Sequence, residues 1–366
     1  MPSFADALQA EGALPQAVEE WPVADLPDLR QDALVERWSH LPRGPVGDDG
    51  IVVCGASWDA QTYAVANALA ARGAVFTVLL SDDHAPGAAD PSEVLSASAG
   101  RVRSVHLRAD GDKPVVFWGD RSVRLPGAAQ GHGSCGAASQ HARMLRSWAT
   151  TLSAGLKVNE PRTQRSAGKK RQLREAARCG LRVPTTMVTR ELPQAMGLFA
   201  GCETVVVKPI DGPVIRVGKR SASVFLPTEI RLCGLATLSG PLPHEVVIQQ
   251  RLHPVREWRV NVVGSRVLAA ARSSESDEPV DWRRCSGGFG FEQRTLPRAE
   301  AEGCVDLTRS LGLEFAGLDL IETADGFWFL EANPDATFAW LDREAGLSIA
   351  DALASHLVLG ERAVAR

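Results

Sequence analysis

The feature that most constrains the fold of this chain is a pair of apolar segments on either side of an Asp-Gly turn signal. The segment GLDLIETADGFWFLEANP carries Asp325 and Gly326 between two apolar runs, which predicts a β-hairpin. If its register is symmetric about Asp325, Asp319 faces Glu331, because both residues lie six positions from the centre. Directly opposed residues on one face have Cβ atoms about 5 Å apart.

Two opposed carboxylates destabilise a hairpin, and apolar neighbours make an unpaired charge more costly. A divalent cation between them removes this conflict. Asn333 lies two residues beyond Glu331, and therefore on the same face, where it adds a third oxygen ligand. Such a set is typical of Mg²⁺ bound together with substrate phosphates. We therefore expect a magnesium site at Asp319, Glu331 and Asn333; in the alternative, the two carboxylates lie in different registers and are merely solvated.

A second candidate is Lys208, which ends the apolar strand ETVVVKP and precedes the stretch DGPVIRVG. A lysine that leaves a buried strand beside a Gly-containing turn is well placed to contact phosphate oxygens, with loop amides as further donors. On its own this pattern is weak, because the stretch is not GxxxxGK[ST]. A lone lysine at a strand end is more often a surface residue.

A third candidate is the segment VVIQQRLHPVREWRV. An apolar strand that leads into QQRL presents backbone donors and acceptors to an adenine, which makes Gln249, Gln250 and Leu252 candidate nucleotide contacts. Glu257, a few residues later, is a candidate acceptor for ribose hydroxyls, although alone it reads as an ordinary strand carboxylate. Arg259 alternates with Glu257 along the same predicted strand.

The first compact part of the chain is predicted from residues 50–80, where GIVVCGA, QTYAVANALAARG and AVFTVLL read as strand, helix and strand. This βαβ unit implies a parallel sheet. The first strand is followed by GAS rather than GxGxxG, which argues against a dinucleotide-dependent oxidoreductase.

Composition excludes several function classes. The net charge is −4, so the basic excess of a dedicated nucleic-acid binder is missing. No apolar run approaches the ~20 residues of a membrane helix, and the N-terminus lacks signal-peptide features. The seven cysteines are scattered without a CxxC pair, which favours reduced thiols over zinc ligation or disulfides. We therefore expect a cytoplasmic protein that binds neither nucleic acid nor membrane.

Taken in order, these segments resemble the ATP-grasp superfamily. Members carry a phosphate-binding lysine on a central strand, an adenine hinge, a ribose-binding glutamate before an RV strand, and a metal-binding D…E-x-N. Here the corresponding segments are VVVKPI, VVIQQRL, REWRV and GLDLIE…FLEANP, spread over residues 205–334. The resemblance implies an α/β ATP-grasp fold, in which an N-terminal βαβ pre-ATP-grasp domain precedes two α+β subdomains that clasp ATP.

The expected organisation has four parts. They are an extension of unknown role at 1–48, the pre-ATP-grasp domain at 49–155, the central or lid subdomain at 156–245, and a C-terminal subdomain with the metal site at 246–366.

Within the superfamily, the chain is most similar to the peptide-modifying ligases that make ester and amide crosslinks in graspetides, the microviridin-type ribosomal peptides. The resemblance rests on VNEPRTQRSAGKKRQLREAARCGLRVPTTMVT, on VDWRR, and on GLSIADALASHL, and covers roughly 156–360. It is similar, less closely, to ligases that add glutamate to protein carboxyl termini. One departure is the sequence after E-x-N-P, which tends to be Gly-Gln in graspetide ligases and is Asp335-Ala336-Thr337 here.

The resemblance implies a role for each matching residue. Lys169 or its neighbour Lys170 contacts the nucleotide phosphates, and Lys208 the α- and β-phosphates. Arg259 and Arg283 (in DWRR) face the γ-phosphate and the acyl phosphate.

The function implied is that of an ATP- and Mg²⁺-dependent carboxylate–amine or carboxylate–hydroxyl ligase. It would work through an acyl phosphate and release ADP, modifying Asp or Glu side chains of a ribosomal precursor peptide. Because water competes for such an intermediate, a closing lid is needed, and DGPVIRVG and SSESDEPVDWRRCSGGFG are candidates. Two alternatives stay open: a ligase of free amino acids or small metabolites, and a non-catalytic nucleotide-binding regulator. A homodimer also stays open.

Overall fold

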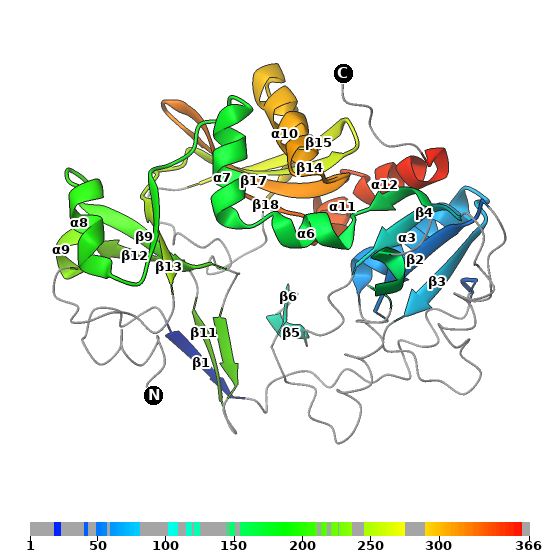
Figure 1. The fold of residues 1–366 in the computed structure, drawn as a ribbon, viewed down its shortest axis with the longest axis horizontal. Coiled ribbons are helices and arrows are strands. Elements are labelled where there is room, and N and C mark those ends of the chain that lie inside the picture. Colours follow the sequence, from blue (N-terminus) through cyan, green and yellow to red (C-terminus); the bar gives the residue numbers. More distant parts are fainter. Residues whose placement is uncertain are drawn as a thin grey trace.

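The computed structural model describes residues 18–22, 40–42, 49–56, 59–80, 102–108, 115–118, 121–124, 145, 147–150, 154–210, 214–217, 221–225, 227–235, 245–274 and 290–360. The described part contains three larger sheets, a parallel one near the N-terminus and two antiparallel ones (Figure 1). None of its helices is both long and apolar enough to cross a membrane.

The N-terminal sheet is parallel and has the strand order β3-β2-β4-β7. Its elements are β2 (Ile51–Gly55), α3 (Ala60–Ala71), β3 (Phe76–Leu80), β4 (Val102–Leu107) and β7 (Ala154–Val158). The predicted βαβ unit is confirmed, because β2, α3 and β3 follow one another and the two strands pair in parallel. Asp59 caps α3 by accepting a hydrogen bond from the Thr62 backbone N–H, so this helix begins directly after the carboxyl end of β2.

A smaller antiparallel sheet has the order β12-β9-β13-β8. Its strands are β8 (Thr186–Thr189), β9 (Thr204–Pro209), β12 (Thr228–Arg231) and β13 (Val246–Gln250). One face packs on the short helices α8 (Ala195–Leu198) and α9 (Leu232–Leu235) in an apolar cluster that includes the buried Phe199; the short helix η2 (Leu192–Gln194) precedes α8. Alternation along β9 and β13 therefore puts Lys208 and Gln249 on the opposite face.

The largest sheet is antiparallel and has the order β16-β15-β14-β17-β18. Its strands are β14 (Arg256–Val263), β15 (Arg266–Ser273), β16 (Glu292–Gln293), β17 (Phe315–Thr323) and β18 (Gly326–Asn333). The helices α7 (Lys169–Arg178) and α10 (Arg298–Ser310) cover one face through an apolar cluster that includes Trp258, Leu318 and Phe329. The other face is free to carry polar side chains.

The remaining helices connect the large sheet to the N-terminal sheet. They are α6 (Pro161–Ser166), α11 (Ala339–Ala345) and α12 (Ile349–Leu359). Leu353 and Leu357 of α12 are fully buried in the same apolar cluster as Ile51 and Val53 of β2. The carboxyl-terminal helix therefore packs on the first domain, beside α3 and β4 (Figure 1).

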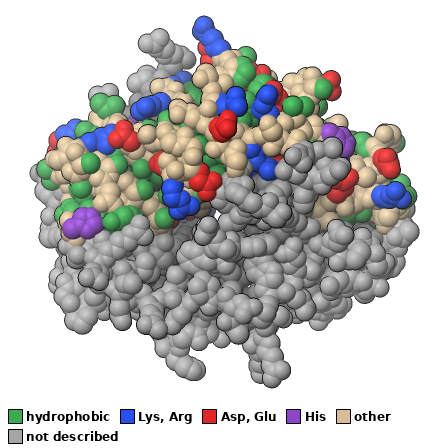
Figure 2. Space-filling view, turned by 180° about the vertical axis from the view of Figure 1, so that it is seen from behind, with side chains coloured by type: hydrophobic (Ala, Val, Ile, Leu, Met, Phe, Trp, Pro, Cys, Tyr) green, Lys and Arg blue, Asp and Glu red, His purple; other side chains and the backbone are tan. Residues whose placement is uncertain are grey.

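Two small sheets complete the described part. The hairpin of β10 (Val214–Val217) and β11 (Ser221–Phe225) follows β9, and the N-terminal segment adds β1 (Val18–Pro22) to its edge in the order β1-β11-β10. A second hairpin pairs β5 (Val115–Trp118) with β6 (Arg121–Arg124). The predicted domain limits at 48, 155 and 245 stay predictions. Figure 2 shows acidic and basic side chains interspersed over the described part of the rear face, in keeping with the near balance of charge.

Candidate active site

The hairpin of β17 and β18 places Asp319 directly opposite Glu331, as the sequence predicts. The turn differs from the expected one, however. Thr323 pairs with Gly326, so Ala324 and Asp325 form a two-residue turn, and Gly326 has φ +111°, which a residue with a side chain rarely adopts. Continued without interruption, this register would place Leu330 opposite Asp319.

A bulge corrects the register. Leu320 pairs with Phe329 while Asp319 pairs with Glu331, so Leu330 is the extra residue of β18. In a regular strand Phe329 and Glu331 would share a face, because they are two residues apart. The bulge allows Phe329 to be buried in the core and Glu331 to project from the opposite face. The same register places Asn333 opposite Gly317.

Each carboxylate of the pair has a cation of its own. Arg259 Nη1 lies 3.2 Å from Asp319 Oδ1, and Lys169 Nζ lies 3.2 Å from Glu331 Oε2. The Asn333 amide donates a hydrogen bond of 3.2 Å to Glu331 Oε1. The predicted metal ligands are thus close together and only partly exposed, at 23% for the Asp319 side chain and 24% for that of Glu331.

Lys208 approaches the same carboxylates from the smaller sheet. It is buried, and its Nζ donates a hydrogen bond of 2.8 Å to Gln249 Oε1. The pKa of Lys208 is lowered to about 8, chiefly by burial and also by the charge of Lys169, although Glu331 and Asp319 act to raise it. Lys208 therefore lies within electrostatic reach of the two predicted carboxylate ligands, Asp319 and Glu331.

The structure separates the two lysines that the sequence left as alternatives. Lys169 is the first residue of α7 and reaches Glu331 and the Pro209 carbonyl, the latter at 3.4 Å. The Lys170 side chain is 71% exposed and lies 4.0 Å from Glu245. Only Lys169 lies at the candidate site.

Strand β14 brings Glu257 and Arg259 to the same face of the large sheet. Glu257 is buried and contacts two arginines: Arg272 Nη2 at 2.9 Å and Arg259 Nη2 at 3.7 Å. Arg272 lies on β15 opposite Glu257 and was not predicted from the sequence. The sequence signal that could have indicated Arg272 is its position at the end of the apolar run VLAAAR, on a strand that pairs with the one carrying Glu257.

The three hinge residues lie at the end of β13 and just beyond it. Gln249 is buried between Lys208 and Thr186. Gln249 Nε2 donates a hydrogen bond of 2.9 Å to the Thr186 hydroxyl, while Gln249 Oε1 accepts from Lys208, so the glutamine side chain orients the lysine. Gln250 Oε1 accepts a hydrogen bond of 3.3 Å from the Thr185 N–H, and Leu252 is buried. A cavity of about 650 Å³ adjoins the hinge. It is lined by Cys202, Glu203, Thr204, Glu229, Arg231, Gln250, Arg251 and His253.

Arg283 lies outside the described residues, as do most of the two segments predicted as lids. The structure therefore bears on the other predicted site residues alone. It brings together Lys169, Lys208, Glu257, Arg259, Asp319, Glu331 and Asn333.

The donor set fits a magnesium ion. Two carboxylates and one amide are hard ligands, and the arginine and lysine that now neutralise the carboxylates show that the site requires positive charge. In the described part of the chain, no group of three or more His, Cys, Asp or Glu side chains is arranged to hold a metal. A set of two acids and an amide leaves room for phosphate oxygens and water, as Mg²⁺ prefers.

A small sheet and a large sheet that face each other across converging lysines and carboxylates define an ATP-grasp protein. A model of the RimK-like ATP-grasp domain matches residues 169–357, and the chain belongs to this family.

Sequence relatives cover part of the chain. It is 28% identical over 184 residues to a tetrahydromethanopterin:alpha-L-glutamate ligase of Methanocaldococcus jannaschii, a match of 48% of this chain and 60% of that protein. It is 26% identical over 176 residues to a probable alpha-L-glutamate ligase of Pasteurella multocida, a match of 48% of this chain and 51% of that protein. The chain thus spans between half and two thirds of these relatives.

Two solved structures resemble this fold over most of the chain. The macrocyclase MdnC of Microcystis aeruginosa, bound with its precursor peptide MdnA, has a TM-score of 0.64 at 20% identity, covering 84% of this chain and 99% of that one. A RiPP-associated ATP-grasp ligase of Chryseobacterium gregarium, in complex with ADP and a leader and core peptide, has a TM-score of 0.67 at 18% identity, covering 87% and 100%. At these identities the likeness shows the ATP-grasp fold and no more.

Proposed function

We propose that this protein is an ATP- and Mg²⁺-dependent ligase that activates a carboxylate as an acyl phosphate and transfers it to an amine or hydroxyl, with release of ADP. The observation that carries the proposal is the convergence of Lys169, Lys208 and Arg259 on the opposed carboxylates Asp319 and Glu331. Phosphoryl transfer is catalysed mainly by positioning and by neutralising charge, and these are the properties that such a cluster has.

The chain's own residues have separate tasks in this proposal. Lys208, held by Gln249, binds the α- and β-phosphates, and Lys169 binds a phosphate oxygen after releasing Glu331. Arg259 turns from Asp319 toward the γ-phosphate as the charge on the transferred group spreads. Arg283 is proposed for the acyl phosphate.

Nucleotide binding involves the other predicted residues. The adenine is bordered by the backbone at the end of β13 and just beyond it. The residues are Gln249 and Gln250, which end the strand, and Leu252, which follows it. Glu257 accepts from the ribose hydroxyls, because a carboxylate can accept about four hydrogen bonds and two arginines leave some of that capacity free.

Mg²⁺ would be held by Asp319, Glu331 and Asn333, and when bound it neutralises phosphate charge as a Lewis acid. With the metal held there, Arg259 and Lys169, which pair with these carboxylates in the structure, would be able to face the nucleotide phosphates. Metal and ATP are therefore expected to bind together.

The acyl donor we propose is an Asp or Glu side chain of a ribosomal precursor peptide, joined to a hydroxyl or amine of the same peptide. Support comes from the matching segments at 158–189 and from the peptide-bound structures that share the fold over nearly their whole length. Incubating the enzyme with ATP and acidic candidate peptides tests it, since each crosslink removes one water from the peptide mass. Unchanged peptide masses together with ATP turnover on another carboxylate would refute the peptide assignment.

A second candidate is a ligase of free amino acids or small metabolites. It is favoured by the sequence relatives, which are named as alpha-L-glutamate ligases. Both candidates use the same ATP site and differ in the acceptor and in the size of the acyl donor. The third reading, a nucleotide-binding regulator without turnover, predicts ADP binding but no ADP release.

A further inference from the structure

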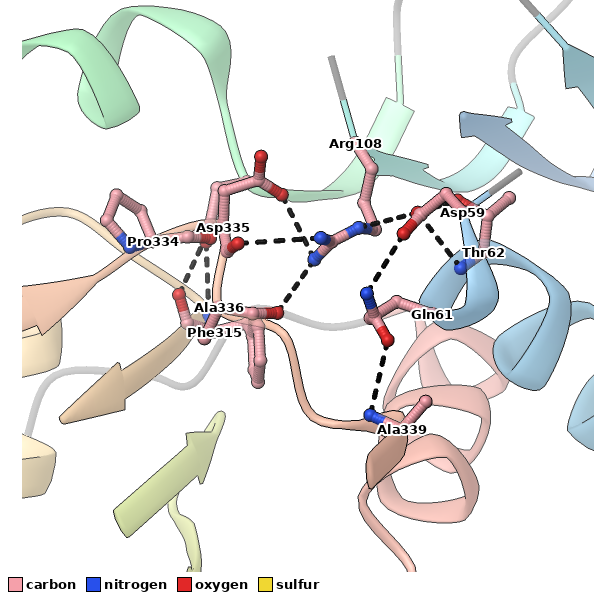
Figure 3. Close-up of polar contacts among 10 residues, drawn as sticks. Asp59, Gln61, Thr62, Arg108, Phe315, Pro334, Asp335, Ala336 and Ala339 are labelled. Atoms are coloured by element: carbon pink, nitrogen blue, oxygen red, sulfur yellow. Dashed lines mark hydrogen bonds and ion pairs between the residues drawn. The ribbon is translucent and has the colours of Figure 1, made fainter. Parts of the chain in front are cut away.

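The carboxyl edge of the N-terminal sheet holds a buried arginine that no step of the proposed reaction uses. Arg108 follows β4, and its side chain is 5% exposed. Its Nε lies 2.7 Å from Asp59 Oδ2, and its Nη1 lies 3.0 Å from Asp335 Oδ1 and 2.9 Å from the Ala336 carbonyl oxygen (Figure 3). Arg108 thus joins the first domain to the turn that follows the predicted metal ligands.

The N-terminal side of this contact is preorganised. Asp59 accepts from the Thr62 N–H at 3.1 Å and from Gln61 Nε2 at 3.0 Å, so its carboxylate is fixed before it binds Arg108. Gln61 also accepts from the Ala339 N–H at 3.3 Å, at the start of α11 (Figure 3). Two contacts therefore join residues 335–339 to the N-terminal part of the chain: the Arg108–Asp335 ion pair and the hydrogen bond from the Ala339 N–H to the Gln61 side chain.

The opposite side of the turn is held by close packing. A Cβ atom added to Gly317 would lie 2.4 Å from Ala336 Cβ, so glycine is required for this approach. Asn159 Nδ2 donates to the carbonyl oxygens of Phe315 and Pro334, each at 2.8 Å. The turn is thus fixed between the first domain and β17.

This turn directly follows the end of the strand that carries Asn333. Asn333 pairs with Gly317 and lies two residues before Asp335, so a shift of the 335–336 backbone moves the last predicted metal ligand. Asp335 is also where this chain departs from the Gly-Gln sequence of the ligases that it resembles. The acid at that position is the one that Arg108 binds.

We propose that Arg108 is a positioning residue of the metal site: from the N-terminal domain it holds the Asp335-Ala336 turn, and thereby Asn333, without touching a substrate. This inference rests on the proposed function, in that it takes Asn333 as a magnesium ligand. In this inference the role of Asp335 is to bind Arg108, and so to join the turn to the N-terminal sheet.

Calorimetric titration of ADP, with and without Mg²⁺, tests the inference in the full chain. Asp335→Asn keeps the shape of the turn and removes its charge, and Arg108→Met removes the cation. In both variants we expect the Mg²⁺-dependent gain in ADP affinity to fall about 10-fold or more, as is usual when partners of metal ligands are lost. ADP affinity without Mg²⁺ should stay within about 2-fold of wild type, and Arg108→Lys should recover part of the loss.

The control is Asp49→Asn, which removes an exposed ion pair with Arg103 at the opposite, amino end of the same strands. It should leave both affinities unchanged. Equal weakening of ADP binding with and without Mg²⁺, or wild-type Mg²⁺ dependence in folded Asp335→Asn, would overturn the positioning role. If wild type itself binds ADP without any effect of Mg²⁺, the proposed function fails instead.

Discussion

Asp319 lies directly opposite Glu331, and each of the two carboxylates has its own cation, Arg259 for the first and Lys169 for the second. Two acids on one face of a hairpin are unfavourable by themselves, so the two ion pairs stabilise the arrangement. In the proposed function the same cations contact phosphates when Mg²⁺ is held by the carboxylates. The pair is therefore where we expect metal and nucleotide binding to be coupled.

Glu331→Gln is expected to reduce ATP-dependent product formation about 100-fold or more, because a ligand charge is lost where phosphate charge must be neutralised. Product formation is followed by mass spectrometry at fixed Mg²⁺. The control is Glu292→Gln, at an exposed position of the edge strand β16. Wild-type turnover of Glu331→Gln would remove this residue from the metal site.

Product should form with release of ADP and phosphate, one of each per bond. Acyl-phosphate chemistry transfers only the γ-phosphoryl group, and Lys208, which is hydrogen-bonded to Gln249, is proposed to hold the other two phosphates. Separating the nucleotides by chromatography after turnover decides the question. AMP as the stoichiometric nucleotide product would contradict the proposed mechanism.

Lys208→Met is expected to weaken ATP binding strongly and yet to stabilise the unliganded protein by about 1 kcal/mol, because a buried charge is removed at the loss of one hydrogen bond to Gln249. The pKa of Lys208 is lowered from 10.5 to about 8, so the folded state disfavours the protonated amine. The resulting destabilisation of wild type is complete below pH 8 and declines as the pH rises from 8 to 10.5.

Urea unfolding of wild type and Lys208→Met across this pH range measures the effect. The stability difference between the two proteins should shrink as the pH rises. Lys170→Met, at an exposed neighbouring lysine, should change neither stability nor ATP binding. A variant at Lys208 that is less stable than wild type at every pH would show that the lysine is structurally required.

Part of this site could be read from the sequence, and part could not. The Asp319–Glu331 pair was predicted from a register symmetric about Asp325, and the pair is confirmed. The two residues face each other for a reason other than a symmetric register. The turn has two residues, 324 and 325, and the bulge at Leu330 then shifts the register by one so that Asp319 pairs with Glu331. A bulge leaves little trace in sequence, because it changes which residue is buried and not the type of residue.

The contacts between distant segments were harder to predict. Arg272 and Arg108 read as ordinary arginines in apolar strands, and only the three-dimensional pairing with Glu257, Asp59 and Asp335 gives them partners. The βαβ unit and the final hairpin follow from local patterns of burial and turn residues. Partners more than 200 residues apart, such as Arg108 and Asp335, carry no local signal.

Arg272→Met should destabilise the protein by about 3 kcal/mol, because it leaves the buried carboxylate of Glu257 with Arg259 as its nearest cation. The double variant Glu257→Gln with Arg272→Met should recover part of that loss, since the buried charge is then gone. Denaturant unfolding of the single and double variants measures the coupling. Strictly additive effects would show that the two side chains do not interact energetically.

The last prediction concerns the size of the acyl donor. A peptide donor must be held by surface outside the ATP cleft, while one side chain reaches the γ-phosphate beside Arg259. Remote binding energy is then used to position the reacting carboxylate, so truncating the substrate lowers turnover as well as affinity. Free Asp or Glu should therefore support ADP release at least about 100-fold more slowly than an acidic ribosomal peptide. Asp335, where the chain departs from the Gly-Gln sequence of graspetide ligases, is ion-paired with Arg108 beside the N-terminal sheet. Efficient ADP release with a free amino acid, and none with peptides, would assign the protein to the small-molecule ligases.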